Sequence, residues 1–251
     1  MPHTERMLWA WVRIAGAVAA ASGFIAGLIV NVARARRFGE DLGAVLANYL
    51  SFLTIFTTLL VVIVLIVAAV WSLRHPGTSP EPFAIALSMA VVTAPTLLVG
   101  AVYNLLLRGL PSEAALTDPP FIFACDRYAI EVLHVVLPLF LVIDLLFAPR
   151  RRGLPWWSLT VLVGYPLVWT IYTMVRGELV ANPDGSAPWW YPYPFLDPHG
   201  DGGYGSVMLY IGGITVAFVV IGSLIIAIGR FRHRRALRRA GAAAAVDATA
   251  A

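Results

Sequence analysis

The sequence predicts an all-α membrane protein, a bundle of six transmembrane helices with both termini in the cytoplasm. Of its 251 residues, 59% are hydrophobic and 13% are charged, whereas a soluble domain carries about 25% charged residues. Charge-free stretches recur along the chain, and they are long enough to cross a bilayer, since a span needs about 20 predominantly apolar residues. All 18 basic residues are arginines, and their placement favours one side of the membrane.

This composition excludes several classes of protein. A water-soluble fold cannot cover so much apolar surface, which excludes a soluble globular enzyme and a disordered chain. The lone Cys125 cannot form an internal disulfide, which excludes a disulfide-linked secreted domain. The excess of positive charge is concentrated at one end of the chain, and this pattern points to a membrane surface as partner and not to nucleic acid.

Five charge-free windows are long enough to span a bilayer. They lie at residues 14–33, 42–73, 82–107, 153–175 and 202–229. A sixth stretch, from Phe121 to Ala148, is also apolar but contains five ionisable residues: Asp126, Arg127, Glu131, His134 and Asp144. Hydropathy alone does not decide whether this stretch spans the membrane.

The distribution of arginine decides in favour of six spans. With six, twelve of the 18 arginines share the side of the two termini, including Arg150–Arg152 and six between 230 and 239. With five, those two clusters would lie on opposite faces. Because basic residues favour the cytoplasmic side, we predict a multi-pass protein of the cell membrane. It comprises a single domain over residues 1–239 and a disordered, alanine-rich tail over residues 240–251.

The fourth predicted span carries the most informative polar residues. On an α-helix Arg127, Glu131, His134 and Pro138 share one face. Ionisable groups are costly in hydrocarbon, so they turn inward, pair and mark function by default. Either Arg127 and Glu131 form a structural ion pair, or they orient a working His134. Asp144 points elsewhere, and we expect it to anchor the arginines at 150–152.

The second predicted span carries hydroxyl groups, and Ser51, Thr54 and Thr58 share one of its faces. Such residues commonly let membrane helices approach closely. Depth favours a second interpretation, because Thr54 and His134 each lie about 12–13 Å below the outer surface if both spans start there. A hydroxyl and an imidazole at one level are the minimum for nucleophilic catalysis, in which the imidazole takes the hydroxyl proton.

Other spans add a polar and aromatic lining. Asn104 lies on one face of the third span, and the fifth span places four residues on one face: Tyr165, Trp169, Tyr172 and Arg176. Plain packing or an interfacial aromatic belt also accounts for these faces. Arg127 and Arg176, both near the outer surface, are suited to hold a carboxylate. The outer loop over 177–205 alternates aromatic rings with prolines, as expected of a lid or of an interfacial anchor.

These residues resemble a known superfamily. The chain is similar to the androgen-induced and androgen-dependent membrane hydrolases and their bacterial six-helix relatives. The similarity lies in the six-span plan and in three stretches: Ser-Phe-Leu-Thr-Ile at 51–55, Leu-His-Val-Val-Leu-Pro at 133–138 with Asp144, and Trp-Tyr-Pro-Tyr-Pro-Phe-Leu at 190–196. The resemblance covers most of residues 6–230. It implies hydrolysis of fatty acid esters of hydroxy fatty acids by an intramembrane threonine and histidine, roles that would fall on Thr54 and His134.

The sequence therefore leads to the hypothesis of an intramembrane hydrolase of lipid-like acyl esters. Thr54 is the expected nucleophile, with Ser51 and Thr57 as neighbouring alternatives, His134 the general base and Glu131 the group that orients the imidazole. Substrate contacts are expected from Ser51, Thr58, Asn104, Arg127, Tyr165, Trp169, Tyr172 and Arg176, and Asn104, Arg127 and Arg176 are also candidate oxyanion donors. We expect membrane lipids or lipid esters as substrate and no metal or organic cofactor.

The alternatives are a small-molecule or proton-coupled transporter, with Arg127, Glu131 and His134 as a relay, and a non-catalytic membrane scaffold. The sequence does not indicate the oligomeric state.

Overall fold

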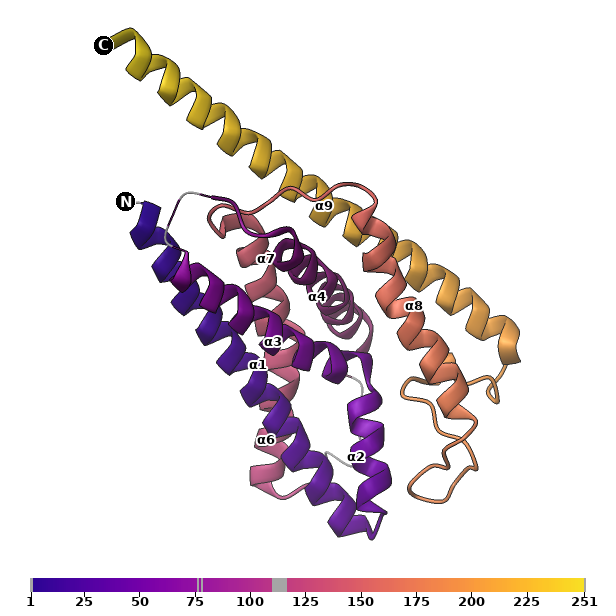
Figure 1. Ribbon diagram of the computed structural model, residues 1–251. Helices are drawn as coiled ribbons and strands as arrows, with labels where there is room; N and C mark the ends of the chain where they lie inside the picture. Colours follow the sequence, from indigo (N-terminus) through magenta and orange to yellow (C-terminus); the bar gives the residue numbers. More distant parts are fainter. Residues whose placement is uncertain (1, 76, 78, 110–116, 251) are drawn as a thin grey trace.

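The computed structural model describes residues 2–75, 77, 79–109 and 117–250, and every regular element in these residues is a helix. Six helical segments are long and apolar enough to cross a membrane, which confirms the predicted all-helical fold and is compatible with a multi-pass membrane protein (Figure 1). They are built on α1 (Pro2–Phe38), α3 (Leu53–Arg74), α4 (Phe83–Val102), α6 with α7 (Pro120–Glu131 and Leu137–Phe147), α8 (Ser158–Gly177) and α9 (Gly203–Ala250).

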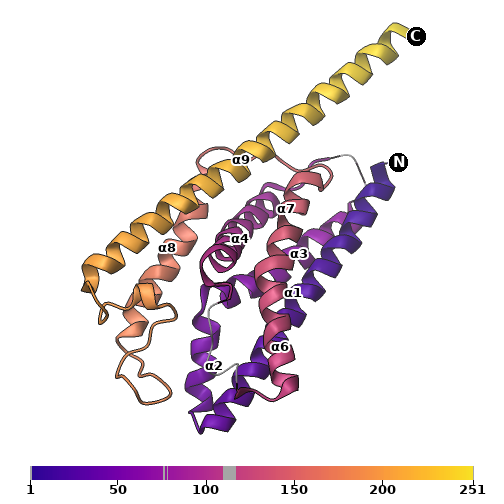
Figure 2. The ribbon, with the colours of Figure 1, turned by 180° about the vertical axis from the view of Figure 1, so that it is seen from behind.

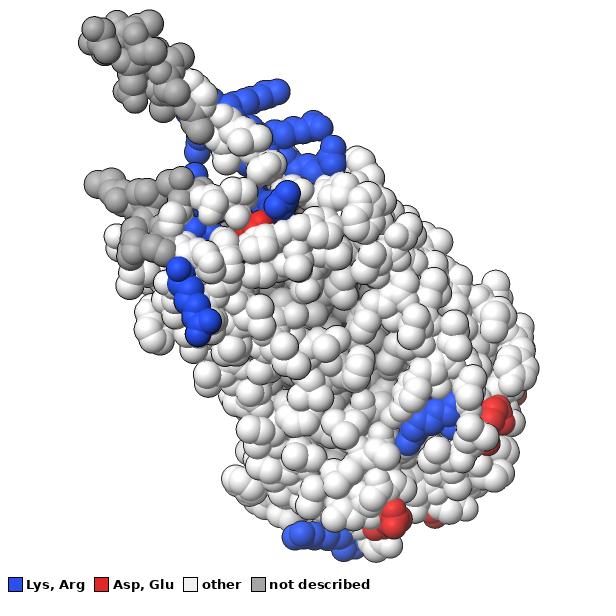
Figure 3. All heavy atoms as spheres, in the orientation of Figure 1, with Lys and Arg blue, Asp and Glu red and all other residues white. Residues whose placement is uncertain are grey.

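Both termini lie at the same end of the bundle (Figure 1). We call this the terminal end, and we call the opposite end, where the chain between α8 and α9 folds, the loop end. Figure 3 shows that the charged side chains on one face gather toward these two ends, with a broad uncharged band between them. This arrangement is expected of a bundle whose middle lies in hydrocarbon.

Two apolar cores hold the bundle together, and α4 takes part in both. In the first core, α1, α3 and α4 pack with the α6–α7 unit around buried residues such as Leu65, Met89 and Leu141. In the second, α8 and α9 pack against the opposite side of α4 around Leu162, Phe218 and Ile226. Figure 2 shows α4 between these two groups of helices.

The second predicted span is interrupted. A short helix, α2 (Leu42–Ser51), ends one residue before α3 begins, and Phe52 between them has an extended backbone with φ −64° and ψ 134°. An interrupted helix at membrane depth is tolerated only where protein covers it or where it lines a cavity. Here Trp169 on α8 donates its indole N–H to the carbonyl of Ser51 at 3.0 Å and so satisfies the open end of α2.

Two segments of π-helix lie next to each other in the bundle. The first, η1 (Tyr103–Leu107), continues α4, and the second, η2 (Val132–Val136), joins α6 to α7. A π segment bonds residue i to i+5 and often marks a functional site. The sequence predicts one regular helix over 121–148 with Glu131 and His134 on the same face, whereas η2 widens this turn and changes their relative direction.

The connection between α8 and α9 folds over the α2–α3 break. It contains one turn of 3₁₀-helix, η3 (Pro194–Leu196), whose Leu196 is buried in the second core. The ring of Phe52 meets the rings of Trp190 and Tyr193 edge to face, with centroids 5.6 Å apart in both pairs. The loop is therefore part of the packed bundle.

The last helix is longer than the sequence suggests. The prediction of a disordered tail from residue 240 differs from the structure, in which α9 continues through Ala250. Residues 240–250 are rich in alanine, which has the highest helix propensity of all residues. Figure 1 shows α9 running on beyond the other helices at the terminal end.

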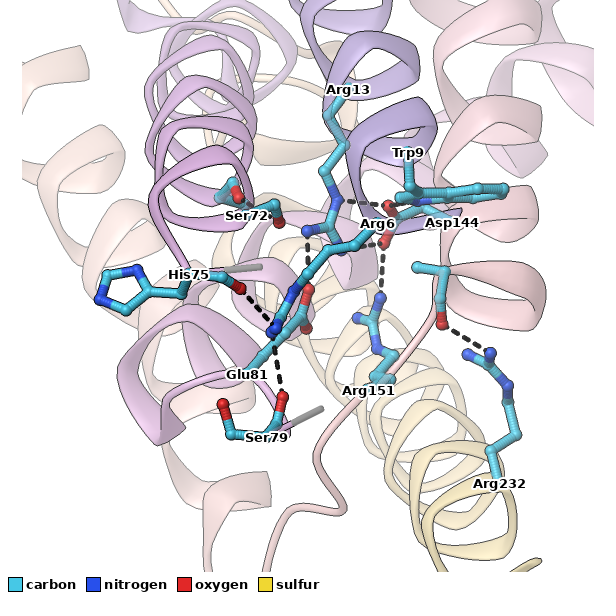
Figure 4. A network of polar contacts seen from close by, with 12 residues as sticks. Arg6, Trp9, Arg13, Ser72, His75, Ser79, Glu81, Asp144, Arg151 and Arg232 are labelled. Atoms are coloured by element: carbon cyan, nitrogen blue, oxygen red, sulfur yellow. Dashed lines mark hydrogen bonds and ion pairs between the residues drawn. The ribbon is translucent and has the colours of Figure 1, made fainter. Parts of the chain in front are cut away.

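A buried ion network closes the terminal end (Figure 4). Asp144 on α7 is fully buried and binds Arg13 at 2.8 Å and Arg151 at 2.6 Å. Arg13 also binds Glu81 at 2.6 Å. The expected anchoring of the 150–152 cluster by Asp144 is thus confirmed for Arg151. Arg6 adds hydrogen bonds to carbonyl groups of the α3–α4 connection.

Candidate active site

Thr54 and His134 line the same cavity. This cavity has a volume of about 100 Å³ and lies among α3, α4, η1, η2, α8, α9 and the loop before α9. The other side chains of its wall are mainly apolar or aromatic, among them Leu98, Tyr103, Trp169, Tyr193, Ile211 and Phe218. The threonine and the histidine, 80 residues apart in sequence, therefore line one small, mainly apolar space within the membrane-spanning part of the fold.

The imidazole of His134 is held in one tautomer by the backbone. Its Nδ1 lies 3.0 Å from the carbonyl oxygen of Ile130. Since a carbonyl oxygen only accepts, Nδ1 carries the proton, and Nε2 of the neutral ring then holds a lone pair. The ring of Tyr103 packs against the imidazole with centroids 4.5 Å apart and limits its rotation. His134 thus has the form that a general base requires.

The backbone at His134 is supported from α4. Pro138 has no N–H with which to satisfy the His134 carbonyl four residues earlier. The side chain of Asn104 on η1 donates to this carbonyl at 2.8 Å. The close approach depends on Gly100, where a Cβ would lie 2.7 Å from Pro138 and 3.1 Å from the His134 carbonyl. Asn104, expected to contact substrate or an oxyanion, therefore holds the histidine's backbone instead.

Thr54 is the second residue of α3, directly after the helix break. The first N–H groups of a helix have no partner within it, and Phe52, the residue before this helix, does not cap them with its side chain. The hydroxyl of Tyr193, from the loop, contacts the Thr54 side chain and the N–H groups of Leu53 and Thr54. Burial raises the pKa of Tyr193, and these contacts act in the opposite direction. The N–H groups at a helix start favour negative charge at this point.

The neighbouring hydroxyl groups are engaged elsewhere. Ser51 bonds to the carbonyl of Ala47 and to the hydroxyl of Tyr172, and Thr57 bonds to the hydroxyl of Tyr165. Thr58 donates to the carbonyl of Thr54 at 2.7 Å. None of these three lines the cavity that holds His134. Their positions favour Thr54 over Ser51 and Thr57 as the nucleophile.

Glu131 does not hold the imidazole as expected. Its carboxylate accepts a hydrogen bond from Arg108 at 2.8 Å and lies 3.8 Å from Arg127, while Ile130 binds the imidazole. The reason is the π turn, which directs His134 into the cavity and leaves Glu131 at the more exposed surface. Arg127 is 54% exposed and is not part of the cavity wall, a position unsuited to an oxyanion donor.

The four predicted residues of α8 line a second, wider space. This groove has a volume of about 680 Å³ and lies between α8 and the α2–α3 unit. Trp169 belongs to the walls of both the groove and the cavity. Each of the four side chains also bonds to the α2–α3 unit: Tyr165 to Thr57, Trp169 and Tyr172 to Ser51, and Arg176 to Asn48. They fix the broken helix in place.

Three buried polar atoms near the loop end have no partner among the described residues. They are Asn48 Nδ2, Thr173 Oγ1 and Arg176 Nη1. Arg176 Nη2 already donates to Asn48 at 2.7 Å, and the guanidinium lies over the ring of Trp190. All three can donate a hydrogen bond, so this cluster is suited to an anionic acceptor such as a carboxylate.

Two aromatic residues of the site have contacts that the sequence does not predict. Tyr193 lies in the 190–196 stretch that carries the resemblance, but nothing there predicts its contact with Thr54, and no sequence pattern predicts the packing of Tyr103 on His134. Pro138 does predict one feature of the site, because a proline four residues after His134 leaves the histidine's carbonyl without its helical N–H partner.

No protein-family model, curated protein or solved structure matches this chain.

Proposed function

We propose that this protein is an intramembrane hydrolase of lipid-like acyl esters, with Thr54 as nucleophile and His134 as general base. The observation that carries the proposal is the cavity wall they share, together with the Ile130 bond that leaves His134 Nε2 free to accept a proton. The resemblance in sequence points to the same two residues.

The reaction has two steps. Thr54 Oγ1 attacks the ester carbonyl carbon while His134 Nε2 takes the hydroxyl proton. The N–H groups at the start of α3 and the Tyr193 hydroxyl face the carbonyl oxygen as it becomes negative. The bond to the alcohol breaks, and His134 returns the proton to the departing oxygen. Water, deprotonated by His134, then attacks the acyl-threonine, and the acid leaves as the proton returns to Thr54.

The wide groove is the proposed route for the substrate. Its side chains Leu50, Phe56, Val168 and Tyr172 are 44–68% exposed in the isolated chain, so in a bilayer they face hydrocarbon. An acyl chain can reach the cavity from the side, past Trp169. An acidic group on the substrate would bind the donors of Asn48, Thr173 and Arg176, which fits the esters of hydroxy fatty acids that the resemblance implies.

The positions of the charges support an orientation as well. By the positive-inside rule, we place the terminal end in the cytoplasm and the loop end outside, in the cell membrane.

The packing of the terminal half of the bundle disfavours a transporter. The side chains of Val61, Leu65, Met89 and Leu141 are fully buried there, and the ion network of Arg13, Asp144 and Glu81 lies beyond them. A solute in the cavity meets a packed core in that direction.

The test is ester hydrolysis by the purified chain, measured as fatty acid released from a panel of lipid esters. Thr54→Ala and His134→Ala are each expected to remove nearly all turnover, and the double variant to be little worse than either single, since residues that act as a unit are not additive. A fluorophosphonate probe should label the wild type and not Thr54→Ala.

Thr215→Ala is the matched control. Thr215 is another half-buried threonine of a membrane helix; its hydroxyl donates to the carbonyl of Ile211, and Thr215 itself is not among the residues that line the cavity. It is expected to keep full activity. Full turnover in His134→Ala, or turnover lost equally in Thr215→Ala, would contradict the mechanism. Loss in Ser51→Ala with full activity in Thr54→Ala would move the nucleophile to Ser51.

A further inference from the structure

A second site lies at the terminal end, far from the cavity of Thr54. It is a hollow of about 530 Å³ between α9, the end of α7 and the connection from α7 to α8. Five arginines line it, namely Arg150, Arg151, Arg232, Arg235 and Arg239. No acidic side chain is among its described lining residues. Figure 3 shows arginines gathered around α9 where it leaves the bundle.

Two of these arginines form the rigid floor of the site. Arg232 donates to the carbonyls of Leu145 and Ala148 at 2.6 and 2.7 Å, which attaches α9 to the end of α7. Arg151 is bound by Asp144 (Figure 4). The hollow is thus defined by hydrogen bonds between separate elements and does not depend on the position of one exposed side chain.

The other three arginines are not neutralised. Arg150, Arg235 and Arg239 form no ion pair with an acid in the described part of the chain. Arg235 and Arg239 follow Arg232 by three and seven residues, so Arg232, Arg235 and Arg239 share one face of α9. Arg150 has a φ of 61°, in the left-handed region that favours glycine. Arg150 therefore adopts a backbone conformation that is strained for a residue with a side chain.

The hollow also has an apolar side. Leu146, Phe231 and Leu237 line it and are 40–65% exposed. A soluble anion such as free phosphate has no use for these surfaces, whereas a phospholipid brings a phosphate and two acyl chains together. Guanidinium groups are well matched to phosphate oxygens, and basic pockets at the cytoplasmic ends of membrane helices bind anionic headgroups.

We propose that this hollow binds the headgroup of an anionic phospholipid from the surrounding leaflet, with the lipid phosphate against Arg150, Arg235 and Arg239 and an acyl chain along Leu146 and Phe231. The site is independent of the proposed hydrolysis. It differs from a diffuse attraction to negative lipids because it uses one face of α9.

The test compares two faces of the same helix. Arg234 and Arg238 are exposed, like Arg235 and Arg239, but do not line the hollow. The variant R235Q/R239Q and the control R234Q/R238Q therefore lose the same charge from neighbouring positions. The full chain in detergent is titrated with phosphatidylglycerol, phosphatidylcholine or inorganic phosphate, and bound lipid is counted by native mass spectrometry.

One phosphatidylglycerol per chain is expected to bind, about tenfold or more tightly than phosphatidylcholine. R235Q/R239Q should weaken this binding about tenfold or more, while R234Q/R238Q should keep it within about threefold. Both variants should unfold at the same temperature in lipid-free detergent, since none of the four side chains is buried. Equal weakening by the two variants, equal binding of phosphatidylcholine, or displacement of the lipid by millimolar inorganic phosphate would each overturn the proposal.

Discussion

Replacing Asp144 by asparagine is expected to destabilise the bundle by about 3–5 kcal/mol, the usual cost of removing one partner from a buried ion pair. Asp144 has no exposed surface, and its carboxylate accepts hydrogen bonds from Trp9 at 2.8 Å, Arg13 at 2.8 Å and Arg151 at 2.6 Å (Figure 4). Asparagine keeps the shape but not the charge. Arg13 would retain Glu81, whereas Arg151, 6% exposed, would have no acid partner among the described residues.

Two further variants rank the effect. Glu81→Gln is expected to cost less, because one oxygen of Glu81 already has no partner and Arg13 would keep Asp144. Glu178→Gln at the loop end removes an exposed contact with His199 and is expected to cost the least of the three, because solvent screens an exposed pair. The measurement is unfolding in detergent by heat or by titration with dodecyl sulfate, followed by circular dichroism. If Asp144→Asn is no less stable than Glu178→Gln, the network does not hold the terminal end together.

Three other predictions concern the site and the loop. Pro138→Ala restores an N–H that competes for the His134 carbonyl, so turnover should fall at least about tenfold with folding intact; unchanged turnover would mean that the π turn is not needed. Arg176→Gln should slow hydrolysis of esters that carry a free carboxylate and spare their methyl esters, measured as released acid; equal slowing of both would rule out a carboxylate site. The hydrogen bond from Tyr191 and the contact with His199 lower the pKa of Glu178, so its stabilisation of the loop is present above about pH 4.3 and is lost as the pH falls further. Tryptophan fluorescence of the loop should show this acid transition in the wild type and not in Glu178→Gln.

The membrane architecture was predictable because its signals are long and repeated. Each span needs about 20 apolar residues, and twelve of 18 arginines on one side decide the number of spans. The shared cavity of Thr54 and His134 could be anticipated from equal depth, since depth depends only on where two helices begin.

The detailed geometry of the site depends on contacts between distant parts of the chain. Nothing in Ser-Phe-Leu at 51–53 resembles a helix breaker, and the break at Phe52 is satisfied by Trp169, more than a hundred residues later. The π turn at His134 is held by Asn104 from another helix. A regular helix was therefore the natural expectation, and it led to the wrong partner for the imidazole.

The small size of the cavity limits what a bound ester can look like. The cavity, at about 100 Å³, is much smaller than the groove beside it, at about 680 Å³. In the proposed reaction the ester group and a few carbons occupy the cavity, and a longer arm passes Trp169, which lines both the cavity and the groove. If the chain hydrolyses esters as proposed, Trp169 sets the length of the arm that fits the cavity and leaves the longer arm among the lipids.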